Sequence, residues 1–350
     1  MDNSPDTAKG RYESLSASRS VFLEAARECS KVTIPALIPL NDDRGSNSNL
    51  PKPYQSVGSR GVNHLAAKLM LALFPPGTSF FRFALDPFLV QEGAQQAEVA
   101  SGDVQAEMEK ALSMVERAVV GHMESNGHRT ALFEALRHLV VGGNVLLELT
   151  DKDTLRYHRI SHFVVSRDRS GNVLEIIVRE GMAPTTLSPE ARSILSENTD
   201  TQEDGSDDKS IDVYTWIRRE GNRWKVHQEI SDKVVPKSDG SYPLDKSPWV
   251  PLRWSKIDGE DYSFGYVYDF LGDLLSLESL SRSIVMMSAA ASKILIFVDD
   301  SGTTNRKKVA EAESGDVLPG GIVALSFLRT SLASRSMFRP RSSSTSSSQM

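Results

Sequence analysis

Few residues in this chain have the types and spacing that a chemical site requires. His158 and His162 lie four residues apart, a spacing that joins two metal ligands on a helix but not reliably on a strand. They fall where the sequence predicts strands and a turn, so we favour ordinary polar positions over a metal site. The phosphate loop of P-loop ATPases is missing, because no glycine is followed by lysine, and neither G-x-S-x-G nor H-E-x-x-H occurs.

Two other pairs have weak chemical signatures. Asp269 and Asp273 share a face of a predicted helix and would suit the paired carboxylates of a metal-dependent nuclease. No motif places a third carboxylate, so we favour a solvated or subunit-facing stripe. Gly58 and Gly61 precede a predicted helix, where backbone N–H groups can hold phosphate. No βαβ unit surrounds them, and we interpret them as a turn that lets the helix begin.

The charge balance limits contact with nucleic acid. The 350 residues include 46 acidic and 40 basic side chains, a formal net charge of −6, which argues against holding DNA by bulk attraction. Any DNA contact must be local or loose. Arg306, Lys307 and Lys308 form a compact basic run, for which a solvated loop is the default and contact with DNA or an acidic partner the alternative. We predict no catalytic residue, no cofactor and no bound metal.

The remaining composition predicts a protein made and kept in a reducing cytoplasm. Cys29 is the only cysteine, so neither an internal disulfide nor a cysteine-rich metal site can form. No apolar run approaches the roughly 20 residues of a membrane span. The first ten residues lack the basic-then-apolar pattern of a secretory signal. We therefore expect no membrane partner.

The expected secondary structure changes near residue 143. Before it, apolar residues recur at helical spacing, which predicts helices at 10–31, 58–74, 104–124 and 129–141. Phe80, Phe81 and Phe83 predict a short apolar strand. After it, alternation predicts strands at 145–149, 155–160, 163–166, 173–179, 213–218 and 224–230, with hairpin turns at Gly171 and Gly221. Helices followed by antiparallel strands indicate the α+β class.

Two segments stand apart from this pattern. Residues 183–212 are acidic and polar and predict a partly mobile insertion. No proline occurs between residues 252 and 318, so residues 262–292 can form about 45 Å of helix, and a strand is predicted at 293–298. One face of the helix carries Val267, Leu271, Leu274, Leu277 and Ile284.

The exact amino-acid sequences of three segments are more specific than these patterns of periodicity and composition. The first segment includes Arg11-Tyr12-Glu13, residues 19–27 and Thr33-Ile-Pro-Ala-Leu-Ile-Pro39. The second segment covers residues 53–58, 61–69, 73–76 and 80–83. The third segment includes Pro248-Trp-Val-Pro-Leu-Arg-Trp254 and residues 259–262, 271–274 and 314–317. In this order, over roughly residues 10 to 320, they resemble the head-to-tail connector, or portal, proteins of short-tailed phages of the T7 type.

The resemblance implies a portal fold. Residues 1–256 would form a helical and β wing domain, 257–292 the first stem helix, and 293–324 the start of the clip that meets motor or tail. It also implies a dodecameric ring at one capsid vertex of the virion, assembled in the host cytoplasm, through which double-stranded DNA is packaged and ejected. The implied partners are further copies of the chain, the terminase motor that supplies the ATP chemistry, and tail-adaptor, capsid and scaffold proteins.

The physics of a channel agrees with this implication. Each neutralised phosphate adds affinity through counterion release, so a net acidic subunit suits DNA that must slide. A ring needs heterologous interfaces that close on themselves. A long helix with an apolar face could pack against neighbouring copies in the wall of such a ring. The predicted subunit-interface residues are Val267, Leu271, Leu274 and Ile284, and the predicted DNA- or partner-contact residues are Arg306, Lys307 and Lys308.

The C-terminal composition departs from the family. No aspartate or glutamate follows Asp316, and the last twenty residues hold nine serines. We expect residues 325–350 to be an unmatched, disordered tail, and we favour a shifted reading frame after about Ala324 over a natural tail. On that interpretation the product is truncated and lacks the second stem helix, so the wing folds while the ring is unstable or unformed.

Two alternative functions stay open. An adaptor or scaffold protein that binds a portal without forming the channel would also suit the chain's length. A metal-dependent DNA-processing enzyme of the packaging machinery would depend on Asp269 and Asp273.

Overall fold

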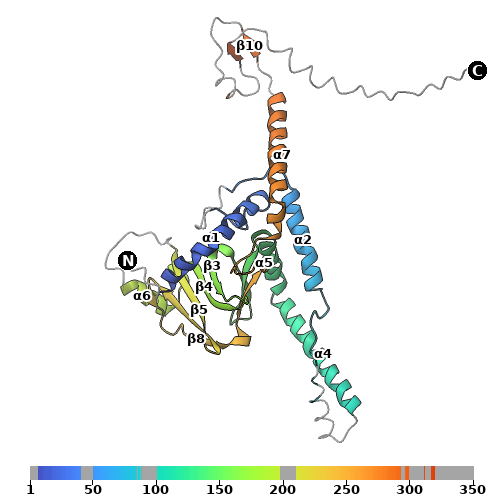
Figure 1. Cartoon of the computed structure of the whole chain (residues 1–350), viewed down its shortest axis with the longest axis vertical. Coiled ribbons are helices and arrows are strands. Elements are labelled where there is room, and N and C mark those ends of the chain that lie inside the picture. Colours follow the sequence, from blue (N-terminus) through green and yellow to red (C-terminus); the bar gives the residue numbers. More distant parts are fainter. Residues whose placement is uncertain are drawn as a thin grey trace, which may run out of the picture. The chain divides into compact units, whose positions relative to one another are not determined.

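The computed structural model of the chain describes residues 7–40, 50–84, 86, 88, 101–197, 210–292, 296–298, 311 and 317–319 (Figure 1). The chain divides into two compact units, Met1–Glu278 and Ser279–Met350. Helices and antiparallel sheets of the first unit confirm the α+β class.

The helices before the first sheet agree with the apolar periodicity. They are α1 (Ala8–Val32), α2 (Val57–Leu73), α4 (Ser101–Ser125) and α5 (His128–Gly142). Thr7 caps α1, its hydroxyl accepting the N–H of Gly10 at 3.2 Å. Gly127 and Gly143 flank α5 with φ of +69° and +73°, a left-handed conformation that glycine adopts without steric cost.

A small antiparallel sheet follows α5 directly. Its strands are β1 (Asn144–Leu149), β2 (Leu155–Arg159) and β9 (Trp249–Arg253), in the order β2-β1-β9. Leu146 lies opposite both His158 and Pro251 in the register, and its side chain is fully buried. The sheet therefore joins the end of α5 to the segment that precedes the predicted long helix.

The larger sheet is antiparallel in the order β3-β4-β5-β6-β7, with β8 paired to β6. Its strands are β3 (Phe163–Arg167), β4 (Val173–Met182), β5 (Ile211–Glu220), β6 (Arg223–Ile230), β7 (Lys233–Val234) and β8 (Gly240–Pro243). Short 3₁₀ turns connect strands at η2 (Ile160–His162), η3 (Pro184–Thr186) and η4 (Leu244–Lys246). Gly171 (φ +90°) and Gly221 (φ +59°) lie in hairpin turns, as predicted.

Helix α1 covers the larger sheet and supplies much of the core. It contacts β3 and β5 and also packs on α5 (Figure 1). Phe22, Ala26 and Cys29 of α1 are buried with Phe163 and Ile217 of the sheet. Burial raises the pKa of the Cys29 thiol to about 12, so this cysteine is a packing residue.

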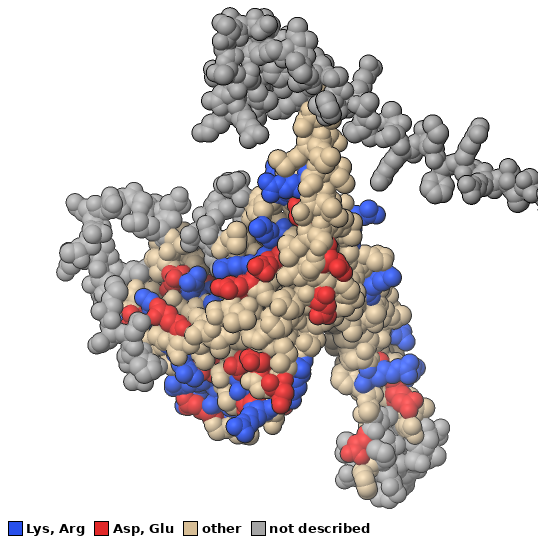
Figure 2. All heavy atoms as spheres, turned by 45° about the horizontal axis from the view of Figure 1, so that its top comes forward, with Lys and Arg blue, Asp and Glu red and all other residues tan. Residues whose placement is uncertain are grey.

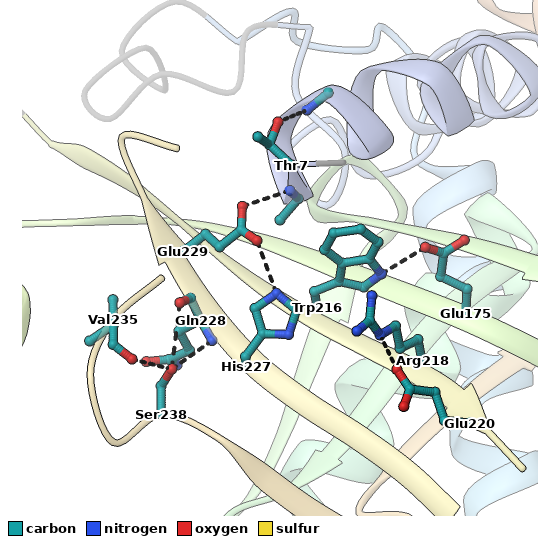
Figure 3. A network of polar contacts seen from close by, with 12 residues as sticks. Thr7, Glu175, Trp216, Arg218, Glu220, His227, Gln228, Glu229, Val235 and Ser238 are labelled. Carbon is teal, nitrogen blue, oxygen red and sulfur yellow. Dashed lines mark hydrogen bonds and ion pairs between the residues drawn. The ribbon is translucent and has the colours of Figure 1, made fainter. Parts of the chain in front are cut away.

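Polar contacts also fix α1 on the sheet (Figure 3). The buried carboxylate of Glu175 on β4 accepts the indole N–H of Trp216 at 2.7 Å. It also accepts Nε–H of Arg11 from α1 at 3.0 Å. Because both donors satisfy a carboxylate that is largely removed from water, the pairing specifies where α1 lies along the sheet.

The strand predicted around Phe80 is wrong. Phe80, Phe81 and Phe83 lie in irregular backbone, with successive ring centroids 5.1 Å and 5.6 Å apart in edge-to-face contacts. The N–H of Phe83 donates to the Glu116 carboxylate of α4 at 2.8 Å. This backbone group pairs with a helix side chain, and the aromatic rings pack on one another in place of a sheet.

The long helix begins later than predicted. Helix α7 covers Leu271–Ser292, about 33 Å, and follows the 3₁₀ turn η5 (Tyr266–Phe270). Before it, the N–H of Ser263 donates to Oδ1 of Asn144 at 3.0 Å. A Cβ on Gly265 would lie 2.5 Å from the carbonyl oxygen of Val141. These contacts hold the chain against the end of α5, so the helix predicted at 262–292 is α-helical only from Leu271.

The predicted insertion at 183–212 is structured in part. Helix α6 (Pro189–Glu197) lies within it, and Ala191 and Ile194 pack against Val213 and Ile230 of the sheet. Residues 198–209 lie outside the described part of the chain. Among the described residues no helix has the length and apolar content needed to cross a membrane.

The described part of the second unit includes a short strand pair. β10 (Ile296–Val298) pairs in parallel with β11 (Val317–Pro319). β10 falls inside the strand predicted at 293–298. The rest of the predicted clip start at 293–324, apart from these strands and residue 311, lies outside the described residues, as does the tail at 325–350.

Candidate subunit interface

The predicted interface residues fall into two groups in the structure. Val267 of η5 and Leu271 of α7 are only 6% and 9% exposed and belong to the main core. Leu274 is half-buried against that core, whereas Ile284 is 63% exposed. Side chains that their own chain covers offer little surface to a neighbour. We therefore move the proposed contact away from Val267 and Leu271, toward Ile284 and the residues around it.

The exposed part of α7 is apolar on more than one face. Its large side chains, 48–71% exposed, are Leu275, Leu280, Ile284, Val285, Met286 and Met287. Arg282 is the single charged residue between Ser279 and Ser292. A helix that is apolar all round is normally buried, and contiguous apolar surface marks an interaction site. Of this group the sequence predicts only Ile284, because the prediction follows one stripe; the lack of polar residues opposite that stripe is the signal for the rest.

A mainly apolar cavity lies between α2 and the start of α7. Its volume is about 510 Å³, and its walls include Val62, Leu65, Phe270, Leu274 and Leu277, with His64, Lys68 and Asp273 as polar lining. Glu278 of α7 accepts the N–H of Tyr54, in the segment before α2, at 2.9 Å. This bond links α7 to the segment before α2, and residues of both helices line the apolar recess.

The two histidines of the weak metal pattern have other partners. Nε2 of His158 lies 2.7 Å from a carboxylate oxygen of Glu148. Burial acts to raise the pKa of Glu148, but contacts with His158 and the charge of Arg156 outweigh it and lower that pKa. Arg159 donates to His162 Nε2 at 2.9 Å. Each histidine thus lies in a local polar contact.

No metal centre is found in the part of the chain that the structure describes. There, no three His, Cys, Asp or Glu side chains are grouped so that they could hold an ion. Asp269 lies in η5 and Asp273 in the first turn of α7. The paired-carboxylate hypothesis gains no third ligand from the fold.

Gly58 and Gly61 lie inside the first turns of α2. The N–H of Gly58 donates to the Gln55 side chain at 2.9 Å, and that of Arg60 donates to the carbonyl of Ser56 at 3.0 Å. A Cβ on Gly58 would lie 2.7 Å from the Val32 carbonyl oxygen. Gly58 therefore permits close approach to the end of α1, in agreement with a helix entry instead of a phosphate site.

Surface charge is mixed on the face drawn in Figure 2. Lys and Arg side chains are interspersed with Asp and Glu, and neither sign gathers into a single patch. The basic run Arg306, Lys307 and Lys308 lies outside the described residues. The described surface in this view therefore shows no large basic field for DNA.

Comparison with known proteins settles the family. Residues 5–346 match the family model described as bacteriophage head to tail connecting protein. The chain belongs to this family. The match extends to residue 346, beyond the point near residue 324 where the sequence predicts that the resemblance ends.

The curated relatives that this chain matches are named portal proteins. That of Escherichia phage T7 is 37% identical over 331 residues, which cover 93% of this chain and 60% of the relative. That of Enterobacteria phage SP6 is 28% identical over 314 residues, 88% of this chain and 58% of the relative. That of Pseudomonas phage phiKMV is 28% identical over 306 residues, 86% and 58%. The chain spans about three-fifths of the length of these relatives.

Proposed function

We propose that this chain acts as a portal subunit. Twelve copies would form a ring at one capsid vertex of a virion, through which double-stranded DNA is packaged and ejected. The ring would dock the terminase motor and the tail-adaptor, capsid and scaffold proteins. The family match and the portal relatives support a structural function without catalysis.

The proposed architecture divides the chain into three parts. Residues 1–256 would be the wing, α7 the main part of the first stem helix, and 293–324 the start of the clip. The two sheets with α1 and α5 form a packed body that can carry α7. Host-cytoplasmic assembly remains part of the proposal.

The exposed apolar surface of α7 is the observation that carries it. Leu280 and Ile284 are each 63% exposed and lie one helical turn apart, so they share a face. Burying such side chains against a neighbour would contribute about 1.5–3 kcal/mol each. Identical copies that meet through two different surfaces form a closed ring when the rotation closes. The recess between α2 and α7 is a suitable second surface.

Charge supports a conduit over a DNA-gripping protein. The net charge of −6 and the mixed charge of Figure 2 limit the number of phosphates that one subunit neutralises. Fewer neutralised phosphates mean weaker and less salt-dependent retention of DNA. A polymer can then move along the ring without being held.

The test is self-association of the purified chain as a function of concentration. Sedimentation velocity should show weak oligomers that grow with concentration and dissociate on dilution, and negative-stain images of them should show curved assemblies, as expected for an unstable ring. The double variant Leu280→Ser, Ile284→Ser should shift association to at least tenfold higher concentration. Val21→Ser is the matched control, because Val21 is 61% exposed on α1.

The outcome can also contradict the proposal. A chain that stays monomeric at every concentration, with the double variant indistinguishable from it, removes the ring and favours the adaptor alternative. Association weakened equally by Val21→Ser would show that exposed apolar area in general, and not α7, drives it.

A further inference from the structure

The recess between α2 and the first turns of α7 has an exposed wall on its α2 side (Figure 1). Gly61, His64 and Lys68 line it from α2, and all three are exposed. A Cβ on Gly61 would meet no atom of the described residues within 4 Å. Because a glycine presents only its backbone, another helix can come close to α2 at this point. We call this hollow of about 510 Å³ the α2–α7 recess.

Leu275 lies at the level of the recess but on the other side of α7. Asp273, Leu274 and Leu277 line the recess, whereas Leu275, which is 48% exposed, does not. Since each residue of an α-helix turns about 100° and rises about 1.5 Å, Leu275 is about 200° from Leu277 and about 3 Å from it along the axis. The first turns of α7 therefore combine an apolar hollow on one side with an exposed leucine on the opposite side.

Small residues flank Leu275 on its own face. Gly272 lies three residues before it and Ser279 four residues after it, so both are its neighbours on the helix surface. A Cβ on Gly272 would meet no atom of the described residues within 4 Å. Leu275 thus projects as a single large apolar side chain from a face that another helix can approach closely.

A closed ring requires two complementary surfaces at one height. Copies related only by rotation about an axis have equivalent residues at equal heights, and each copy contacts its two neighbours through two different surfaces. A recess lined by Asp273, Leu274 and Leu277 must therefore meet residues of nearly the same number in the next copy. Leu275 meets both requirements, because it has the height of the recess and lies on the opposite side of α7.

We propose that the Leu275 side chain of one copy enters the α2–α7 recess of the next copy. This inference rests on the proposed function and specifies which two surfaces form the contact between subunits. Val62, Leu65 and Phe270 line the recess and would surround the leucine. Side chains that fill a pocket at the centre of an interface carry most of its binding energy.

Opposite charges accompany the two surfaces. Lys68 lines the recess, and Glu278 lies three residues after Leu275, on a neighbouring part of the helix surface. The Glu278 carboxylate accepts the backbone N–H of Tyr54 at 2.9 Å, a neutral donor that leaves its negative charge in place. Asp273 also lines the recess and reduces the positive charge there. The attraction is therefore weak and decreases with salt, and the apolar contact decides the pairing.

The size of the contact predicts weak association between two copies. One leucine in a recess buries far less than the roughly 800 Å² per partner of a standard stable complex. The exposed apolar side chains of α7 beyond Glu278 would add area to the same interface. In a ring each copy is held on two sides, so a contact that is weak in a pair can still contribute to a closed assembly.

Paired variants of the full chain test the contact by sedimentation velocity. Gly61→Leu places a side chain in the recess at a position with open space, and Leu275→Glu replaces the apolar side chain by a charge. Each should shift association to at least tenfold higher concentration. Gly121→Leu in α4, where a Cβ also has no neighbour within 4 Å among the described residues, and Leu174→Glu on β4, where the leucine is likewise exposed, should stay within twofold of the natural chain.

Mixing the two variants distinguishes a head-to-tail contact from a symmetric one. The Gly61→Leu chain keeps Leu275, and the Leu275→Glu chain keeps an open recess, so each mixed pair can form one natural contact. We expect a 1:1 complex, and no larger oligomer, at concentrations where either variant alone is monomeric. Two α7 helices that pack symmetrically would gain nothing on mixing.

A cysteine pair keeps the test decisive if Gly61→Leu does not fold. Cys29 is the only natural cysteine and is buried, so Gly61→Cys with Leu275→Cys puts two accessible thiols on one chain. Oxidation should link successive copies into a ladder of disulfide-bonded oligomers. Gly121→Cys with Leu275→Cys is the control and should give no ladder.

The outcomes separate this inference from the proposed function. If Leu280→Ser, Ile284→Ser weakens association while Gly61→Leu and Leu275→Glu leave it unchanged, the recess has another occupant and only this inference is overturned. A mixture of the two variants that stays monomeric likewise overturns the head-to-tail contact. A natural chain that is monomeric at every concentration, with no disulfide ladder from the cysteine pair, overturns both.

Discussion

The buried carboxylate of Glu229 accepts the backbone N–H of Ala8, 221 residues earlier in the chain, at 2.7 Å (Figure 3). Its other oxygen lies 2.9 Å from Nε2 of His227. Ala8 is the first residue of α1, whose first turn has no acidic residue of its own. A helix N-terminus has unpaired N–H groups and a partial positive charge. Strand β6 thus provides the negative charge that α1 lacks and fixes the start of this helix on the sheet.

Glu229→Gln should destabilise the fold while keeping its shape. The amide retains an acceptor oxygen but loses the charge that favours the helix N-terminus, so we expect a loss of about 1–2 kcal/mol in unfolding free energy. Urea denaturation measures it. Glu220→Gln is the control, because Glu220 pairs with Arg218 and Lys225 at the surface and should matter little. Equal effects of the two substitutions would refute the anchoring role of Glu229.

Arg19 should be intolerant of replacement, because its buried guanidinium satisfies backbone carbonyls. Its Nη1 lies 2.7–3.1 Å from the carbonyl oxygens of Ile160, Ser161 and Phe163. Arg19→Leu leaves buried carbonyls unpaired, so the unfolding free energy should fall by roughly 3 kcal/mol or more. Arg60→Leu, at an exposed position of α2, should change it little in the same urea titration. A mild effect at Arg19 would mean that water replaces the guanidinium.

Two glycine-to-alanine substitutions should change the unfolding free energy in opposite directions. A Cβ on Gly265 would meet the backbone oxygen of Val141 at 2.5 Å, so Gly265→Ala should lower the unfolding free energy by about 1–3 kcal/mol. A Cβ on Gly61 in α2 would have no neighbour within 4 Å, so Gly61→Ala should raise it by about 0.5–1 kcal/mol. Thermal or urea unfolding that moves both variants in one direction would contradict this account.

The sequence predicted the elements whose periodicity is local. Helices α1, α2, α4 and α5 and the strands from β1 to β6 lie close to their predicted ranges, because one buried face imposes a 3.6- or 2-residue repeat. Gly171 and Gly221 marked their hairpins, because those turns need a left-handed residue.

Features set by distant contacts could not be predicted in the same way. Nothing near Gly265 in the sequence reveals that the end of α5 will lie against it, so the predicted start of α7 is too early. Burial of Val267 and Leu271 in the chain's own core depends on the same contact. The cavity lined by Ile34, His138 and Tyr157 has no counterpart among the predicted sites, since these residues converge only through the packing of separate elements.

Stability should also depend on pH through His138. Burial, then the charges of Arg159 and Arg137, lowers its pKa from 6.5 to about 3. The unfolded chain therefore binds a proton that the folded chain rejects between these values, and stability falls as the pH falls from about 6.5 toward 3. Lowering the pH from 7 to 5 should therefore reduce the unfolding free energy by about 2 kcal/mol through the protonation of His138 in the unfolded chain.

Replacing the imidazole isolates this contribution. His138→Phe keeps an aromatic ring of similar size but cannot titrate, so urea denaturation at pH 7 and pH 5 should show a smaller loss for the variant than for the natural chain. The other titrating groups are common to both chains and cancel in the comparison. If both chains lose the same free energy between the two pH values, His138 is not held neutral in the fold.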